Sequence, residues 1–122
     1  MYKILIADDE YLERKAINFY LNKFYENQIE IAAEVSDGKK AFSQALSKDV
    51  DIVLMDIQMP RMNGLEAAEK IKKEKAEIEI IILTAYNEFD NSKKFYQIGA
   101  ADYLIKPYSE IEFCRVINKI LL

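Results

Sequence analysis

The sequence contains no histidine and only one cysteine, Cys114. A single cysteine cannot form a disulfide within the chain, and without histidine the chain offers no ligand set for a structural zinc ion. Long hydrophobic runs are also missing, because no apolar stretch reaches the roughly 20 residues that span a bilayer. The opening segment, MYKILIADDE, lacks the charged start, long apolar centre and cleavage site of a secretory signal. We therefore expect a soluble protein of a reducing compartment, the cytoplasm, with no membrane contact.

Acidic residues outnumber basic residues in the sequence. Lysine and arginine together number 17, aspartate and glutamate number 21, and the formal net charge is −4. Because an acidic chain repels a phosphate backbone, we do not expect this domain to bind nucleic acid directly. A chain of 122 residues is long enough for one domain with one buried core, and we expect residues 1–122 to form it.

Short apolar runs alternate with amphipathic segments along the chain. The pattern predicts strands at 2–7, 29–35, 51–55, 78–83 and 102–105, and helices at 10–25, 39–46, 65–74, 88–98 and 110–121. In the second strand, apolar residues alternate with Glu30 and Glu34, which predicts an edge strand with one face in solvent. Ser109 and Glu112 have the spacing of a capping box for the last helix, and Gly99 is suited to ending the fourth.

This order of elements predicts an α/β fold of the flavodoxin-like, doubly wound (βα)5 type. Repeated strand and helix pairs favour a parallel five-stranded sheet with right-handed crossovers and helices on both faces. In the strand order 2-1-3-4-5, the first and third strands are neighbours at the point where the order reverses. Ligands of such sheets bind there, outside the carboxyl ends of the strands. The residues at those ends therefore form the candidate site.

Acids, a threonine and a lysine occupy those strand ends. Asp8 and Asp9 follow the first strand, Asp56 the third, Thr84 the fourth and Lys106 the fifth. Converging carboxylates repel one another unless a pKa rises, water screens them or a cation binds, and a set of oxygen ligands suits Mg²⁺. A metal ion, a lysine and a hydroxyl can neutralise a phosphoryl group while a carboxylate attacks phosphorus. The pattern therefore indicates phosphoryl transfer to an aspartate.

Each of these residues also has a structural explanation on its own. Asp8 and Asp9 can cap the helix that follows them, and Asp56 can start a turn. Thr84 is of a type common at strand ends, and Lys106 precedes a proline, which often marks a turn. Capping and turns do not readily explain why four strand ends together carry the residues that phosphate and Mg²⁺ chemistry needs. We therefore favour the functional interpretation of the set.

The segments ILIADDE, DIVLMDIQMPRMNG, IIILTAY and DYLIKP resemble, in this order, the signature blocks of the CheY-like receiver domain of two-component response regulators. The similarity runs from about residue 2 to the last helix. The resemblance implies that Asp56 accepts a phosphoryl group from a sensor histidine kinase or a histidine phosphotransfer domain. It also implies a Mg²⁺ (or Mn²⁺) site formed by Asp9, Asp56 and the backbone carbonyl of Gln58, with Asp8 acting through a coordinated water.

The resemblance further implies that Thr84 and Lys106 contact the phosphoryl oxygens, that a cis peptide bond precedes Pro107 and that Tyr103 is the switch aromatic. A phosphoaspartyl group carries about two negative charges, so it would draw the Thr84 hydroxyl and the Lys106 ammonium inward. That movement vacates space into which Tyr103 can turn, which amounts to a shift between two packings. By its position alone, Tyr103 is an ordinary half-buried strand tyrosine.

The predicted fourth helix carries more large apolar residues than one buried stripe needs, namely Phe89, Phe95, Tyr96 and Ile98. The resemblance to receiver domains implies that this helix, the fifth strand and the fifth helix form the output face and a possible homodimer interface on phosphorylation. The alternative is that these aromatic residues pack in the core.

Other functions fit the residues less well. A phosphohydrolase of the haloacid dehalogenase type would need a second acid where Gln58 stands, and a flavin-binding module would need glycine, serine or threonine in the loop DDEYLER. We therefore expect a signalling switch that catalyses its own phosphorylation and dephosphorylation, and not an enzyme acting on a metabolite. The sequence is similar to receivers joined to an AraC-type DNA-binding domain, so we expect the N-terminal part of a longer transcription regulator. A free-standing receiver is the alternative.

Overall fold

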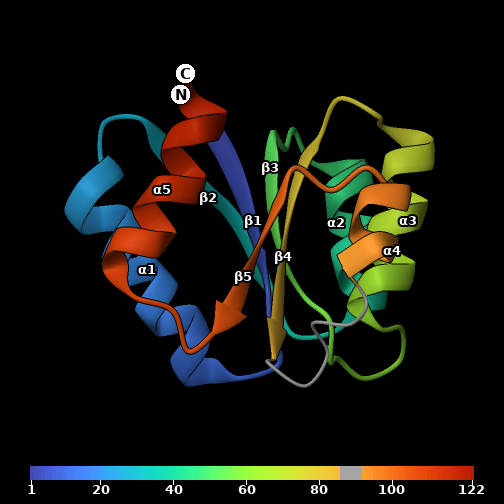
Figure 1. Ribbon diagram of the computed structural model, residues 1–122. Helices are drawn as coiled ribbons and strands as arrows, with labels where there is room; N and C mark the ends of the chain where they lie inside the picture. Colours follow the sequence, from blue (N-terminus) through green and yellow to red (C-terminus); the bar gives the residue numbers. More distant parts are fainter. Residues whose placement is uncertain (86–91) are drawn as a thin grey trace.

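The computed structural model describes residues 1–85 and 92–122, in which strands and helices alternate (Figure 1). The strands are β1 (Tyr2–Ala7), β2 (Ile29–Val35), β3 (Ile52–Asp56), β4 (Glu79–Ala85) and β5 (Asp102–Lys106). The helices are α1 (Tyr11–Tyr25), α2 (Gly38–Ser47), α3 (Gly64–Glu74), α4 (Ser92–Gln97) and α5 (Glu110–Leu121). Among the helices of these two ranges, none has both the length and the apolar character needed to cross a membrane.

The strands form one parallel sheet with the order β2-β1-β3-β4-β5. Figure 1 shows α1 and α5 on one face of this sheet and α2, α3 and α4 on the other. The carboxyl ends of the strands point to the bottom of that view, and the two termini lie together at the top. The predicted doubly wound fold and strand order are confirmed, and the strand order reverses between β1 and β3.

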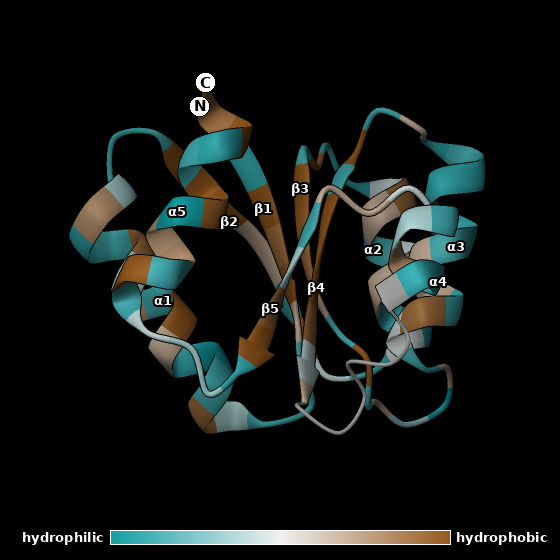
Figure 2. Ribbon diagram, viewed as in Figure 1, coloured by the Kyte–Doolittle hydropathy of each residue, from teal (hydrophilic) through white to brown (hydrophobic). Residues whose placement is uncertain are grey.

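Both faces of the sheet are covered by apolar side chains. Ile4 and Ile6 of β1 pack under α1 and α5, whereas Leu5 of the same strand packs under α2 and α3. The central strand β3 is buried along its whole length. Figure 2 shows hydrophobic colours on the central strands and hydrophilic colours over much of the outer helix surfaces. The sheet is therefore densely packed on both faces and holds the residues at its carboxyl edge in fixed positions.

Strand β2 lies at the edge of the sheet, as predicted, but it contains a β-bulge that the sequence does not reveal. Ile31 lies opposite Ile4 of β1, whereas Ala33 lies opposite Leu5, so Ala32 is an extra residue in the strand. A bulge of this kind shifts the alternation of side chains by one residue. The two halves of β2 therefore present their apolar residues to opposite faces.

The predicted single solvent face of this strand is wrong for that reason. Ile29 packs on the side of α1 and α5, whereas Val35 packs on the side of α2 and α3. Glu34 pairs with Arg14 of α1 at 3.7 Å between Oε1 and Nε, so this glutamate lies on the α1 side of the sheet. Glu30 is exposed.

Three strands reach further toward the candidate site than the sequence predicts. Asp56 is the last residue of β3, Thr84 lies inside β4, and Lys106 is the last residue of β5. These side chains therefore project from the sheet itself and not from flexible loops. The predicted helix 88–98 corresponds to α4, and Phe89 lies outside the described residues.

Short polar signals fix the helix ends. Asp37 and Asn63 cap α2 and α3 through their side-chain oxygens. The predicted capping box of Ser109 and Glu112 at the start of α5 is confirmed. Gly99, just after α4, has a φ of +84°, the left-handed conformation expected of a glycine that ends a helix.

Candidate functional site

Asp8 and Asp56 stand at the carboxyl ends of the two central strands. Ala7 of β1 lies opposite Met55 of β3, so the residues that follow them occupy neighbouring positions at the same edge of the sheet. Asp8 is fully buried and Asp56 is 5% exposed. Two buried carboxylates repel each other and lose hydration, so this arrangement needs a positive charge beside it.

Lys106 of β5 supplies that charge. Its ammonium Nζ lies 2.8 Å from Oδ2 of Asp8 and 3.5 Å from Oδ1 of Asp56. Burial alone would lower the pKa of Lys106, but the hydrogen bond to Asp8 and the negative charge of Asp56 outweigh it and raise the pKa above its ordinary value. The lysine is therefore a permanent cation between two acids.

The carboxyl group of Asp56 is strongly perturbed. Burial, and then the negative charge of Asp8, raise the pKa of Asp56 from 3.8 to about 7, while the charge of Lys106 acts in the opposite direction. A second cation beside this group would favour its ionised form further. The site is thus incompletely neutralised and suited to binding a cation.

Asp9 and Glu10 extend the acidic cluster toward solvent. Carboxylate oxygens of Asp8, Asp9 and Glu10 all lie within 4.8 Å of one another. The backbone N–H of Glu10 donates to Oδ1 of Asp8 at 2.9 Å, which fixes the turn between β1 and α1. Glu10 was not predicted to belong to the site, although it directly follows Asp8 and Asp9 in a run of three acids that could have indicated it.

Arg14 of α1 holds the backbone of the same turn. Its Nη1 donates to the carbonyl oxygen of Asp8 at 2.7 Å, while its Nε lies 3.7 Å from Glu34 of β2. The guanidinium therefore links the bulged edge strand to the first acid of the site. This residue was not predicted from sequence, because its contact is with backbone and depends on how α1 lies on the sheet.

The loop 57–63 brings Gln58 beside the acids. Gln58 and Asp9 line one surface hollow, together with other residues of this loop and the start of α3. The backbone N–H of Gly64 donates to the carbonyl of Ile57 at 2.8 Å and closes the loop. A Cβ atom on Gly64 would overlap the backbone carbonyl oxygen of Asp56, so only glycine allows α3 to begin so close to this strand end.

Thr84 and Tyr103 lie on the neighbouring strands. Thr84 is fully buried, one residue beyond the partner of Asp56 in β4, and its hydroxyl donates to the carbonyl of Ala85 at 3.2 Å. Tyr103 of β5 lies on the α4 side, with its ring 5.6 Å from that of Phe95 between centroids. The Lys106–Pro107 peptide bond, which follows Tyr103 along the chain, is cis.

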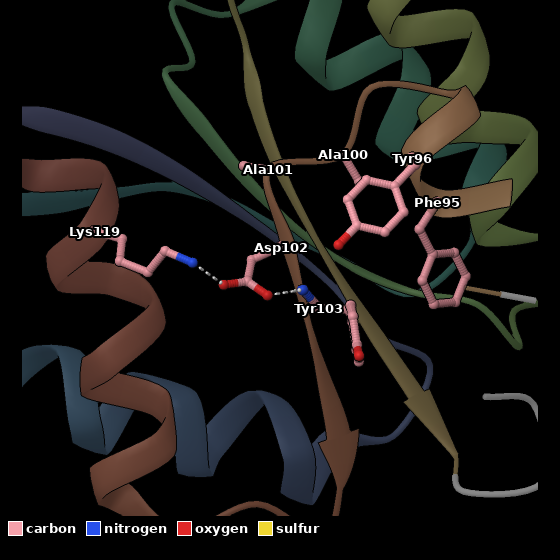
Figure 3. A pocket seen from close by; sticks show the side chains of 7 residues that line it. All are labelled: Phe95, Tyr96, Ala100, Ala101, Asp102, Tyr103 and Lys119. Atoms are coloured by element: carbon pink, nitrogen blue, oxygen red, sulfur yellow. Dashed lines mark hydrogen bonds and ion pairs between the residues drawn. The ribbon is translucent and has the colours of Figure 1, made fainter. Parts of the chain in front are cut away.

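The face around Tyr103 is formed by α4, β5 and α5, as Figure 3 shows. Phe95 is buried in the core, whereas Tyr96 is 79% exposed. On the other side of β5, Lys119 of α5 forms an ion pair with Asp102 at 2.9 Å. The predicted excess of aromatic residues on α4 thus divides, in the described part of the helix, between one core residue and one surface residue.

Comparison with known proteins identifies the family of this chain. A family model described as the response regulator receiver domain matches residues 4–118. The chain belongs to this family. The receiver domain is 34% identical over 119 residues to the transcriptional regulatory protein SrrA of Staphylococcus aureus, and the match covers 98% of this chain and 47% of SrrA. The chain thus spans about half the length of this curated relative.

Solved structures place the receiver domain in the same group. The REC domain of AraT, a response regulator from Geobacillus stearothermophilus, superposes with a TM-score of 0.90, with 32% identity, over 98% of this chain and 92% of that chain. The receiver domain of the sensor histidine kinase PA1611 from Pseudomonas aeruginosa superposes with a TM-score of 0.82, with 27% identity, over 97% of this chain and 95% of that chain. The latter structure has a magnesium ion coordinated in its active site cleft.

The donor atoms of this receiver domain fit a magnesium ion. Asp8, Asp9 and Glu10 offer carboxylate oxygens, and residues of the loop 57–63 line the same hollow as Asp9. Mg²⁺ prefers oxygen ligands and usually retains several waters, so a partly exposed acidic cluster at the rim of a buried site suits it. The oxygen ligands at the strand ends are therefore consistent with the membership of the chain in the receiver domain family, a family of signalling switches.

Proposed function

We propose that residues 1–122 form a cytoplasmic phosphorylation switch in which Asp56 accepts a phosphoryl group from a sensor histidine kinase or a phosphotransfer domain. The position of Asp56 carries this proposal. It is a buried carboxylate at the end of a central strand, 3.5 Å from the Lys106 ammonium and beside Asp8. Ligands of doubly wound sheets bind at this carboxyl edge, which supports a functional role for a buried, perturbed carboxylate there.

In the proposed step, a carboxylate oxygen of Asp56 attacks phosphorus of the phosphohistidine. The new P–O bond forms as the P–N bond breaks, and the electron pair of that bond remains on the imidazole nitrogen. Negative charge on the three phosphoryl oxygens must be neutralised during the transfer. Lys106 is suited to this role, because its ammonium is already within reach of Asp56.

Asp8, Asp9, Asp56 and the backbone carbonyl of Gln58 would hold the metal ion, Mg²⁺ or Mn²⁺. When bound, the ion supplies positive charge to the phosphoryl oxygens. Asp9 and Gln58 flank the same hollow, and Asp8 lies within the acidic cluster, which supports this ligand set. Glu10 adds a further negative charge next to these ligands.

The phosphorylated state would be transmitted through Thr84 and Tyr103. The three acceptor oxygens of a phosphoryl group on Asp56 would attract the Thr84 hydroxyl away from the carbonyl of Ala85, to which it donates in this structure. Tyr103 would then move toward the space beside Thr84 and change its contact with Phe95. A population shift between two packings follows, and the face of α4, β5 and α5 changes its shape.

The changed face is the proposed output surface. We propose that phosphorylation promotes a homodimer through α4, β5 and α5, and that the domain is the N-terminal part of a longer transcription regulator. The relation to SrrA, a transcriptional regulatory protein of about twice this length, supports the second part. The net charge of −4 makes direct binding of this domain to nucleic acid unfavourable.

The test is the intact mass of the protein after incubation with acetyl phosphate and Mg²⁺. We expect a gain of about 80 Da, the mass of one phosphoryl group, that is absent from Asp56→Asn and from a sample treated with a chelator. A gain of the same size in Asp56→Asn would show that another residue is the acceptor. Asp51→Asn, at the opposite end of β3, is the matched control and should be phosphorylated like the wild type.

A further inference from the structure

The start of α2 lies directly against the loop that carries Gln58. This helix begins at Gly38, where a Cβ atom would overlap the backbone carbonyl oxygen of Met62. Met62 belongs to the second half of loop 57–63. Two backbones can approach this closely only where a side chain is missing. The first turn of α2 is therefore a fixed support for one end of this loop.

Asp37 secures this support. It is only 4% exposed, and its Oδ1 accepts a hydrogen bond of 2.7 Å from the backbone N–H of Lys40 as the cap of α2. Its other oxygen, Oδ2, lies 3.9 Å from Nε of Arg61 in the loop. Arg61 has a φ of +69°, a conformation that residues other than glycine rarely adopt. Asp37 therefore lies beside Arg61, the loop residue that adopts the unfavourable positive φ.

The other end of the loop is held at the site itself. Gly64 lies against the carbonyl of Asp56, and its N–H closes the loop onto Ile57. The chain between Asp56, held by Gly64, and Met62, held by Gly38, therefore has little freedom to move. Gln58 lies in this stretch and lines the same hollow as Asp9. A displacement at Met62 must therefore be absorbed by the residues around Gln58.

We infer that Asp37 and Gly38 are positioning residues for the metal site, because they hold loop 57–63 so that the Gln58 carbonyl stays beside Asp9. The inference rests on the proposed function, since it requires Mg²⁺ to bind there. Replacing residues that orient metal ligands without touching the metal typically weakens metal binding by about tenfold or more. Asp37 and Gly38 act one step further out, through the loop, so we expect their replacement to have a smaller effect than this.

The experiment measures the dissociation constant of Mg²⁺ by calorimetry for the whole chain, together with the melting temperature of each metal-free protein. We expect Asp37→Ala and Gly38→Ala to raise the dissociation constant by roughly three- to tenfold. Asp37→Asn keeps a good cap and should stay within about twofold of the wild type. At saturating Mg²⁺, Asp37→Ala should reach the wild-type rate of phosphorylation by acetyl phosphate, because only the affinity for the metal has changed.

Asp51→Ala is the control for general destabilisation. Asp51 Oδ2 accepts a hydrogen bond of 2.8 Å from the backbone N–H of Lys3 at the opposite edge of the sheet, so the loss of this acceptor should lower the melting temperature and leave Mg²⁺ binding unchanged. Equal Mg²⁺ affinity in Asp37→Ala and the wild type, or equal weakening in Asp51→Ala, would overturn the inference. If Gly38→Ala does not fold, Asp37→Ala decides the question alone. A wild type that binds no Mg²⁺ would instead refute the proposed function, so the two failures are distinguishable.

Discussion

Asp56 is an acid that folding places where its neutral form is favoured. Its pKa rises from 3.8 to about 7 on folding, because of burial first and the charge of Asp8 second. An acid with a higher pKa in the folded state binds its proton more tightly there than in the unfolded chain. The associated stability is therefore complete below about pH 4 and is lost progressively as the pH rises to about 7.

Replacing this acid should stabilise the metal-free domain at high pH. Asp56→Asn removes the ionisation, so we expect a higher free energy of unfolding than in the wild type at pH 8, by at most about 4 kcal/mol. The difference should shrink to nearly nothing at pH 4. Urea denaturation between pH 4 and pH 8 in the presence of a chelator measures it. A variant less stable than the wild type at pH 8 would show that the attraction between Asp56 and Lys106 exceeds the cost of burial.

Arg61 offers a second test at the scale of one residue. Its backbone has a φ of +69°, which glycine adopts without a steric penalty, and its side chain is 69% exposed. We expect Arg61→Gly to raise the free energy of unfolding by roughly 0.5–1 kcal/mol, after the greater freedom of the unfolded chain is allowed for. Arg61→Ala loses the same side chain but keeps the strain, so it should give no stabilisation in the same denaturation experiment.

The residues of the site were predictable from sequence because each stands at the end of a recognisable apolar run. Asp8, Asp56 and Lys106 meet as soon as the strand order is known. Their detailed arrangement was not predictable, since the lysine between the two acids depends on side-chain distances. Asp37 was not predicted either, because its contact with the loop depends on how α2 packs beside it and has no signature in the sequence.

At the scale of the elements, the packing of α1 against α5 includes one buried polar contact. The hydroxyl of Tyr25 lies 2.7 Å from Oδ1 of Asn118 and 3.2 Å from the carbonyl oxygen of Cys114, so it can donate to either. Burial is the largest cause that raises the pKa of this phenol above its ordinary value. The contact joins two helices that are 93 residues apart at this point in the chain.

Removing the hydroxyl leaves an acceptor unpaired between the two helices. We expect Tyr25→Phe to lower the free energy of unfolding by about 1–2 kcal/mol, measured by urea denaturation. Tyr11→Phe is a suitable control, because Tyr11 is 59% exposed and its change should have little effect. Phosphorylation of Tyr25→Phe by acetyl phosphate should match the wild type. A loss of phosphorylation would show that this contact is coupled to the site.

Apolar periodicity was sufficient to predict the order and type of the elements, whereas some boundaries and faces were wrong. Asp56 and Lys106 are polar, so they were taken to follow their strands, although each is the last residue of one. The faces of β2 were wrong because an extra residue in a strand leaves no trace in its composition, and only the pairing with β1 reveals it.

At the scale of the whole molecule, metal binding should stabilise the fold, because the acids of the site converge only in the native state. A ligand that binds the folded state alone adds about 2.7 kcal/mol to its stability at 100 times its dissociation constant. We therefore expect the melting temperature to rise with Mg²⁺ in the wild type and to rise much less in Asp9→Asn. Scanning fluorimetry at constant ionic strength measures this. Asp49→Asn, with a carboxylate that is 85% exposed and paired with Lys3, is the control and should respond like the wild type.

The bulge in β2 influences more than the edge of the sheet. Ala32 shifts the strand so that Glu34 meets the guanidinium of Arg14, and this guanidinium also donates to the backbone carbonyl of Asp8. Loss of Ala32 would only remove the bulge, because Glu34 would stay opposite Ile6. One residue inserted between Ala33 and Glu34 would instead turn Glu34 to the opposite face and free the arginine. The turn that carries Asp8 and Asp9 would then loosen although no residue near it had changed. A mutational survey of this domain would therefore find an insertion in the outermost strand acting like a substitution in the proposed phosphorylation site.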